Sequence, residues 1–364
     1  MTERNAWLDT MRAAAILAVV GYHLVQMSPL GESSLATVSQ YGRYGVDLFF
    51  VLSGWLIGSL LWREWSRFQN VDLMRFWARR ALRTIPPYML ALGFSYAAVK
   101  IARDEPFDLA YLFFLQNYYE RMPFFLVSWS LCIEEHFYAI APLSVVVLGR
   151  RIGRIGMVGF LGAALVASPL LRAVELGEVR QEIFGYAATA THLRLDGLAF
   201  GFAASFIASA WPNTLSAVVK STHFNRVMIF LLATLIVSEG AGGSIHYIVG
   251  PSVLAALFCM VLLLGLYNAP ATVGGLWFDG RVVYYLALCS YSMYLMHPLA
   301  IHAAKMITTH VHFPNSHMYW PIALVFILLS SVGFYVAVER MSIRVRDYLV
   351  PRRSATVQEF AIAK

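Results

Sequence analysis

Charged residues are scarce in this chain. They make up 13% of its 364 residues, whereas hydrophobic residues make up 59%. A soluble globular domain carries about a quarter charged residues, so this composition excludes an ordinary soluble fold. The formal net charge of +7 does not indicate nucleic-acid binding, because the basic residues lie between the apolar runs, where they orient membrane segments.

Cysteine is scarce as well. The three cysteines, Cys132, Cys259 and Cys289, all lie within apolar runs, which excludes a disulfide framework. Four histidines surround an external loop (His302, His310, His312 and His317), but their scattered spacing and the lack of a cysteine beside them argue against a metal site, and we predict none. Internal repeats and low-complexity segments are also lacking. Residues 1–345 are therefore predicted to form one membrane domain, followed by a short basic cytoplasmic tail at residues 346–364.

What the chain does have is a series of apolar runs near 20 residues long, the length that spans a bilayer as a helix. Outer-membrane barrels are excluded, because their strands read as alternating segments of about ten residues. We predict an all-α polytopic integral membrane protein with about ten transmembrane helices. The predicted spans are 7–27, 42–62, 84–101, 126–148, 155–174, 193–211, 227–239, 246–267, 282–306 and 319–340.

The distribution of basic residues predicts the orientation of these spans. Most of the 28 Lys and Arg residues fall in the tail and in the loops that follow even-numbered spans. Because basic loops stay in the cytoplasm, both termini are predicted to be inside. The apolar run 107–117 is too short to cross and is predicted to be re-entrant or interfacial. A glycine every third residue over 153–162 predicts close helix packing at the start of the fifth span.

Arg12 and His23 lie together in the first span and are the most informative pair in the chain. They are eleven positions apart, or three helical turns, so both project from nearly the same face about 16 Å apart. Ionisable side chains inside a membrane are costly and mark functional sites. The span directions place further ionisable side chains in the outer half of the membrane: Asp47, Glu134, Glu135, Asp196 and His297. A basic cluster that includes Arg79, Arg80 and Arg83 lies at the inner face.

Each of these residues also has a structural interpretation. His23 can bond to a neighbouring backbone carbonyl, and His297 precedes Pro298 and can fill a kink. The arginines of the basic cluster can set topology or bind anionic lipid. Glu134 and Glu135 can form ion pairs with Arg12 or Arg194. The sequence alone leaves these alternatives open.

Several segments together carry a family resemblance. Arg12 and His23 match an Arg–ten residues–His signature in a first helix. The other segments are 45–54 (GVDLFFVLSG), 79–86 (RRALRTIP), 129–138 (WSLCIEEHFY), 194–197 (RLDG), 290–297 (SYSMYLMH) and 338–340 (VER). In this order and spacing, over about residues 7–345, the chain resembles the acyltransferase-3 family of membrane acyltransferases, which includes bacterial O-antigen and exopolysaccharide O-acetylases. Two positions depart from the family pattern: His136 replaces a Gln, and Met341 replaces a Pro.

The resemblance implies an O-acyltransferase of the cell (inner) membrane. Its donor would be cytoplasmic acyl-CoA, a co-substrate and not a cofactor, and its acceptor a hydroxyl of a surface or lipid-linked glycan. His23 would act as general base or carry the acyl group, and Glu134 or Glu135 would orient its imidazole. Arg80 and Arg83, with Arg79 beside them, would bind the CoA phosphates.

Further roles remain open among several residues. Arg12, Tyr138 and His297 are candidate oxyanion donors, and the predicted substrate contacts are Asp47, Tyr138, Asp196 and His297. Membrane lipids are expected partners and nucleic acid is not. The alternative function is a proton-coupled secondary transporter, since intramembrane His, Glu and Asp also build proton relays. Against it, the sequence has no matching halves with broken helices. A flippase-like or scaffolding membrane protein without catalysis is a third possibility.

Overall fold

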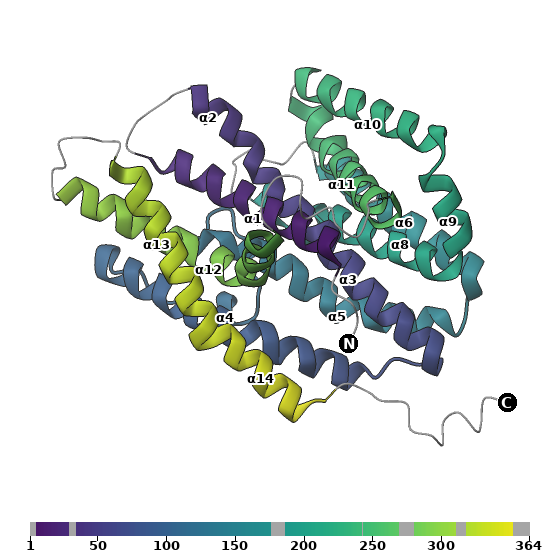
Figure 1. Ribbon diagram of the computed structural model, residues 1–364, viewed down its shortest axis with the longest axis horizontal. Coiled ribbons are helices and arrows are strands. Elements are labelled where there is room, and N and C mark those ends of the chain that lie inside the picture. Colours follow the sequence, from purple (N-terminus) through teal and green to yellow (C-terminus); the bar gives the residue numbers. More distant parts are fainter. Residues whose placement is uncertain are drawn as a thin grey trace.

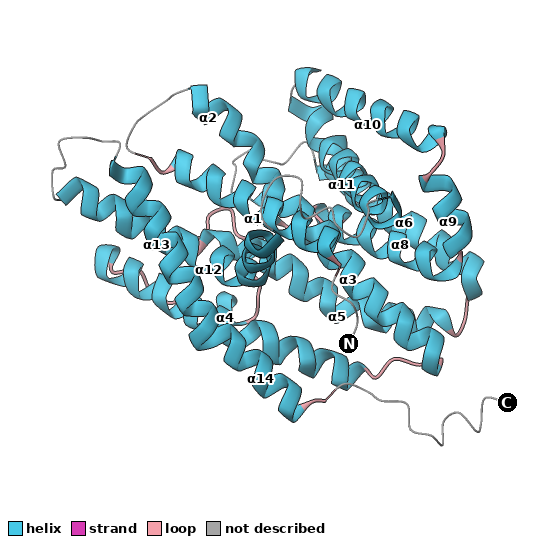
Figure 2. Cartoon of the chain, viewed as in Figure 1, coloured by secondary structure: helices cyan, strands magenta, loops and turns pink. Residues whose placement is uncertain are grey.

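A computed structural model describes residues 5–28, 34–175, 186–241, 243–268, 280–310 and 318–351. These residues form helices and short turns and contain no strand, which confirms the predicted all-α membrane fold (Figure 2). Most of the predicted tail lies outside the described residues. The helices are α1 (Ala6–Gln26), α2 (Ser34–Ser39), α3 (Gly45–Phe68), α4 (Leu73–Arg103), α5 (Trp129–Gly149), α6 (Gly153–Glu175), α7 (Tyr186–Thr189), α8 (Asp196–Ala210), α9 (Pro212–Val219), α10 (Thr222–Ala241), α11 (Gly243–Asn268), α12 (Gly280–His310), α13 (Tyr319–Phe334) and α14 (Arg340–Leu349).

Short irregular helices connect or extend these elements. The 3₁₀ helices are η1 (Gln40–Tyr44), η2 (Leu109–Leu112), η3 (Gln116–Tyr118), η4 (Leu126–Ser128) and η5 (Thr191–Leu193), and η8 (Tyr335–Glu339) is a π-helix between α13 and α14. The apolar run 107–117 thus forms two short 3₁₀ turns, η2 and η3, and no spanning helix.

Seven helical segments in the described part of the chain are long and apolar enough to cross a membrane. They are 6–26, 37–68, 73–103, 126–149, 153–175, 243–268 and 319–349. An eighth is reached if α8 and α9, between which the chain bends by 117°, count as one broken span. Helices α10 and α12 correspond to two further predicted spans but are not among these segments. The ten-span count and the inside placement of both termini stay predictions.

Helix α4 corrects one predicted boundary. It begins at Leu73, eleven residues before the span predicted to start at residue 84, so the arginine cluster is helical and not a loop. Asp72 caps its first turn by accepting a hydrogen bond from Arg75 N at 3.0 Å. Hydropathy missed this part of α4 because the arginines lower the local average.

Helices α3 and α8 pack with their backbones in close approach. A Cβ added at Gly54 would lie 2.1 Å from Leu198 O, and one at Gly201 would lie 2.1 Å from Val51 O. Both helices carry a Gly-x-x-x-Gly pattern, at 54–58 and 197–201, of the kind that lets membrane helices approach closely. This contact holds together the helices that carry Asp47 and Asp196.

The predicted glycine-mediated packing over residues 153–162 is wrong. A Cβ added at Gly153, Gly159 or Gly162 would meet no atom of another helix within 4 Å, and one at Gly156 would meet only the side chain of Ile152, four residues earlier. Regular spacing of glycines does not by itself identify which face of a helix is covered, since that depends on the neighbouring helices.

We expect Gly201→Leu to destabilise the protein by about 3 kcal/mol or more, because the new side chain would overlap the α3 backbone. The matched control is Gly159→Leu, whose site is open. Thermal unfolding of both purified variants in detergent would compare them. Equal transition midpoints for the two variants would contradict the close approach of α3 and α8.

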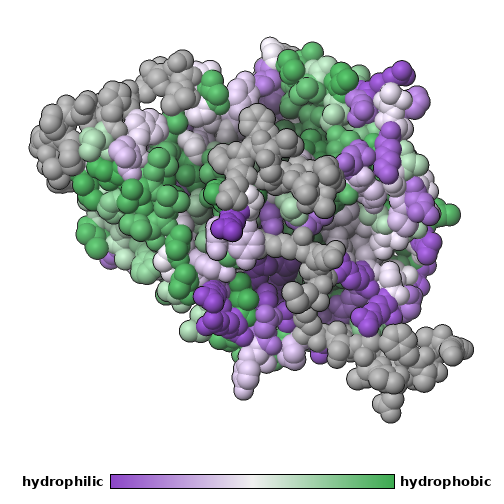
Figure 3. Space-filling model, in the orientation of Figure 1, coloured by the Kyte–Doolittle hydropathy of each residue, from purple (hydrophilic) through white to green (hydrophobic). Residues whose placement is uncertain are grey.

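Helix α1 lies near the middle of the bundle. In Figure 1 it lies between α12–α14 on one side and α6 and α8–α11 on the other, and it contacts α3, α11 and α12. Hydrophobic residues cover the side of the molecule that bears α12 and α13, where Leu329 is 70% exposed (Figure 3). An apolar surface of this kind is suited to contact with lipid. The polar side chains of α1 lie instead inside the bundle, among the other helices.

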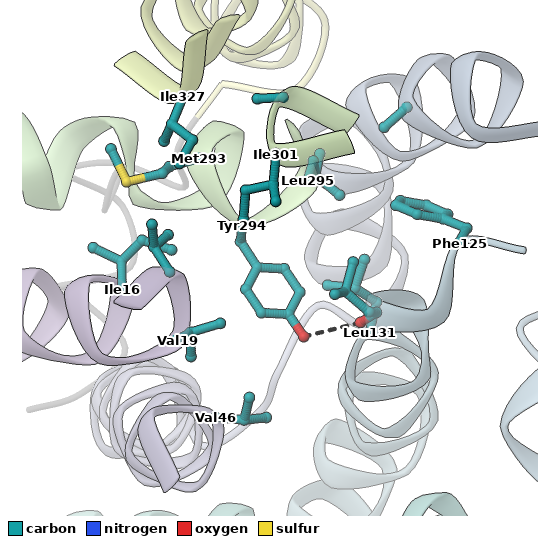
Figure 4. Close-up of a cluster of buried hydrophobic side chains, with 14 of the residues drawn as sticks. Ile16, Val19, Val46, Phe125, Leu131, Met293, Tyr294, Leu295, Ile301 and Ile327 are labelled. Atoms are coloured by element: carbon teal, nitrogen blue, oxygen red, sulfur yellow. Dashed lines mark hydrogen bonds between the residues drawn. The ribbon is translucent and has the colours of Figure 1, made fainter. Parts of the chain in front are cut away.

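Tyr294 of α12 crosses the core that α1, α3 and α5 share. Figure 4 shows its ring extending from α12 between Val19 of α1 and Leu131 of α5. Its hydroxyl donates a hydrogen bond to Val127 O at 2.9 Å and lies 2.6 Å from Ser130 Oγ. These hydrogen bonds fix the position of α12 along the axis of α5. They therefore also fix how far His297 of α12 lies from Glu134 of α5 along that axis.

Candidate active site

Two histidines from α1 and α12 meet inside the bundle. Nε2 of His297 lies 3.2 Å from Nδ1 of His23, and the ring centroids are 5.0 Å apart. His297 is fully buried, with 0% of its surface exposed, and His23 is half-buried. Each ring also approaches the carbonyl four residues earlier: His23 Nδ1 lies 3.0 Å from Val19 O, and His297 Nδ1 lies 3.1 Å from Met293 O. We call these residues the histidine pair.

Glu134 and Glu135 of α5 are held by hydroxyl groups from three helices. Ser53 and Tyr138 donate hydrogen bonds to the two oxygens of Glu134, at 2.9 and 2.7 Å. Thr84 of α4 donates to Glu135 at 2.9 Å. Both carboxylates are thereby fixed between α3, α4 and α5.

Three arginines lie close to these two carboxylates and to a third carboxylate, that of Glu339. The Arg80 guanidinium lies over the Tyr138 ring, 5.0 Å from its centroid, and is close enough to interact electrostatically with both Glu134 and Glu135. Arg83 is similarly close to Glu134 and Glu339, and Arg12 to Glu339. We call this set the charged cluster: Arg12, Arg80, Arg83, Glu134, Glu135 and Glu339.

Glu339 was missing from the predicted site. It is 2% exposed, at the end of the π-helix η8, and accepts a hydrogen bond from Ser292 at 2.5 Å. A π-turn inside a helix is rare and frequently occurs at functional sites. The sequence signal was present, since Glu339 stands in the 338–340 motif, but its burial depends on α12 and α13 packing together.

The histidine pair and the charged cluster lie at different depths. Ser130, four residues before Glu134 on α5, bonds to Tyr294, and His297 follows Tyr294 by three residues on α12. At 1.5 Å per residue, these offsets place His297 roughly 10 Å further toward the predicted outer side than Glu134. The structure thus brings His23 together with His297. It does not bring His23 together with Glu134 or Glu135, whose oxygens bond to hydroxyls elsewhere.

The sequence that forms this site matches a known protein family over nearly the whole chain. A family described as "Acyltransferase domain" matches residues 5–336, nearly the whole chain. The chain belongs to this acyltransferase family. The matched residues include both helices that carry the histidine pair, α1 and α12. Glu339 of the charged cluster lies three residues beyond the last matched residue. The chain is therefore a multi-pass membrane protein of this family.

The chain is similar in sequence to about half the length of curated O-acetyltransferases. It is 26% identical over 313 residues to peptidoglycan O-acetyltransferase OatA of Listeria monocytogenes, which covers 80% of this chain and 48% of that protein. It is 27% identical over 320 residues to O-acetyltransferase OatA of Staphylococcus aureus, covering 80% of this chain and 49% of that protein. The chain thus spans about half the length of these relatives. No solved structure matches it.

Asp47 and Asp196 lie in ion pairs. Asp47 pairs with Arg194 at 2.8 Å, and Asp196, 3% exposed, pairs with fully buried Arg172 at 2.6 Å. Ser252 also donates to Asp196, at 2.6 Å. These contacts favour structural roles for both aspartates, whose predicted substrate contacts remain untested. Arg172 was not singled out in the sequence, where it looked like one more basic residue at a span end.

Two other residues singled out in the sequence, Arg79 and His136, make contacts outside the charged cluster. Arg79 bonds to Asp347 at 2.9 Å and to the Val350 carbonyl, so it fastens α14 to α4. His136, the departure from the family pattern, places Nδ1 2.7 Å from Thr191 Oγ1 and so ties α5 to η5. The described residues contain no group of three His, Cys, Asp or Glu side chains able to hold a metal ion.

Proposed function

We propose that this acyltransferase moves an acyl group, by default acetyl, from cytoplasmic acyl-CoA to a hydroxyl of a surface or lipid-linked glycan at the cell membrane. The observation that carries the proposal is the imidazole of His23, half-buried in a membrane helix beside a second imidazole and above a cluster of half-buried arginines and carboxylates that includes the buried Glu339. The names of the relatives, both O-acetyltransferases, support acetyl as the group and oxygen as its acceptor.

His23 would act as the general base. A sugar hydroxyl is a weak nucleophile at neutral pH, and a positioned base contributes typically 10²–10⁴-fold to the rate. The hydroxyl proton passes to the imidazole while the oxygen attacks the thioester carbonyl. The carbon–sulfur bond then breaks, and the departing thiolate of CoA receives the proton. The products are the glycan ester and free CoA.

Arg80 and Arg83 would bind the phosphates of the donor. Both project from α4 into the charged cluster, and neither guanidinium has a protein hydrogen-bond acceptor within the described ranges. Their N–H groups are thus available to a ligand, and a guanidinium matches the geometry of phosphate oxygens. Glu134 and Glu339 would hold the arginines in place between turnovers.

Mass analysis of surface glycans tests this function. Cells that express the chain should carry base-labile acyl esters that cells without it lack, and cells that express His23→Ala should match those without it. Identical glycans in all three would contradict a glycan acceptor. Transport of a solute without acyl transfer would instead support the secondary transporter.

A further inference from the structure

His297 stands where a carboxylate would orient the base in a catalytic triad. We infer that His297 is a positioning residue: its Nε2 lone pair accepts the Nδ1–H of His23, which leaves Nε2 of His23 as the atom that takes the acceptor proton. The inference rests on the proposed general-base role of His23. It replaces the expectation that Glu134 or Glu135 orients the imidazole.

Two backbone carbonyls determine where the protons lie in the pair. Val19 O, 3.0 Å from Nδ1 of His23, can only accept a hydrogen bond, so this nitrogen carries hydrogen. Nε2 of His297 lies 3.2 Å from the same nitrogen. Two N–H groups cannot point at each other over that distance, so Nε2 of His297 carries the lone pair.

The second carbonyl completes the assignment. A neutral imidazole has one N–H, and with Nε2 bare the hydrogen of His297 must be on Nδ1. Nδ1 indeed lies 3.1 Å from Met293 O, where an N–H is required. The tautomers assigned from the two ends of the pair therefore agree, and one N–H of His23 is shared between Val19 O and His297.

This arrangement serves the reaction before and after proton transfer. Before transfer, a bare Nε2 on His23 is the only ring nitrogen able to accept the hydroxyl proton. After transfer, the imidazolium keeps both acceptors at Nδ1, and its charge is stabilised without a second proton transfer, as a triad carboxylate stabilises it. His297 itself gains and loses no proton.

The contacts around His297 support a positioning role. Its ring packs 5.8 Å from the Tyr294 ring, and the Tyr294 hydroxyl is fixed by Val127 O. The His297 ring is therefore held on one side by the backbone carbonyl of Met293 and on the other by the ring of Tyr294. A fully buried, doubly supported ring can hold the orientation of the half-buried His23.

Two substitutions of His297 test the inference. His297→Leu keeps an apolar volume and removes the acceptor, whereas His297→Gln offers an amide oxygen in its place. For His297→Leu we expect kcat to fall at least about 10–100-fold, the range seen when a metal-bound histidine loses the partner that orients it, with the KM values for acetyl-CoA and acceptor unchanged. His297→Gln should recover a large part of the loss. The control is His302→Leu, an exposed histidine on the same helix.

A spectroscopic measurement separates positioning from a general structural effect. In the wild type, ¹⁵N-labelled His23 should show a protonated Nδ1 and a bare Nε2. His297→Leu should shift the Nδ1 resonance, while His302→Leu leaves it unchanged. A wild-type kcat and an unshifted Nδ1 in His297→Leu would overturn the inference while leaving the general base intact. If His23→Ala retained full activity, the proposed function itself would fail first.

Discussion

His23→Ala is expected to lower acyl transfer by at least about a hundredfold, the lower end of what a general base contributes. The protein should still insert and fold. His23 is half-buried near the C-terminal end of α1, and its hydrogen bonds go to its own helix and to His297. Losing them costs far less stability than emptying an apolar core position. The rate of acyl transfer from labelled acetyl-CoA, measured on purified protein in nanodiscs, checks this.

The thermal transition of His23→Ala provides the control. It should lie close to that of the wild type and of His302→Ala, whose side chain is exposed on α12. More than about a tenth of wild-type activity in a folded His23→Ala protein would exclude a base worth a hundredfold.

Arg80→Ala and Arg83→Ala should each raise the apparent KM for acyl-CoA roughly tenfold or more and leave the KM for the acceptor unchanged. A hydrogen bond to a charged group contributes about 1.5–3 kcal/mol, and each 1.4 kcal/mol is tenfold in affinity. Lysine at either position should rescue only in part, because an ammonium offers a point charge and not a planar fork. Initial rates over a matrix of donor and acceptor concentrations separate the two KM values.

The matched control is Arg75→Ala on the first turn of α4. Arg75 pairs with Asp72 at 3.4 Å and lies outside the charged cluster, so its loss should leave both KM values unchanged. High salt should weaken acyl-CoA binding to the wild type, since phosphate contacts near water are screened. Unchanged acyl-CoA affinity in both Arg80 and Arg83 variants would make these arginines topology determinants and place the donor site elsewhere.

The sequence predicted the class of fold because each spanning helix leaves a local signal. A run of apolar residues defines a membrane helix whatever its neighbours are. The same signal found α4 but placed its start eleven residues too late, because arginines occupy the first turns of the helix and lower its hydropathy. It was also ambiguous at α8, which ends after 15 residues and bends into α9.

The individual site residues were predictable to different degrees. Arg12 and His23 stand out because both are ionisable side chains on one face of one apolar helix. The partner of His23 was not predictable, because the contact with His297 joins residues 274 positions apart and requires α1 to pack on α12. A carboxylate was the reasonable expectation, but Glu134 is bonded to Ser53 and Tyr138 at a deeper level.

Burial was the property that sequence patterns conveyed least. Glu339 and Arg172 read as ordinary polar residues near span ends, yet they are 2% and 0% exposed. Their burial arises from a π-turn and from the packing of α6 on α8 and α11, which no local pattern encodes. The glycines show the same limit, since those at 54 and 201 are covered and that at 159 is open.

The most direct test of the central claim is acyl transfer by the purified chain in liposomes. Acetyl-CoA labelled in the acetyl group would be supplied together with cell-envelope glycan from which esters have been removed by mild base. The account predicts that label moves to the glycan and free CoA thiol appears in equal amount with the wild type, and that neither occurs with His23→Ala. Label transfer that is equal in the two proteins, or absent from both although the wild type is folded, would contradict it.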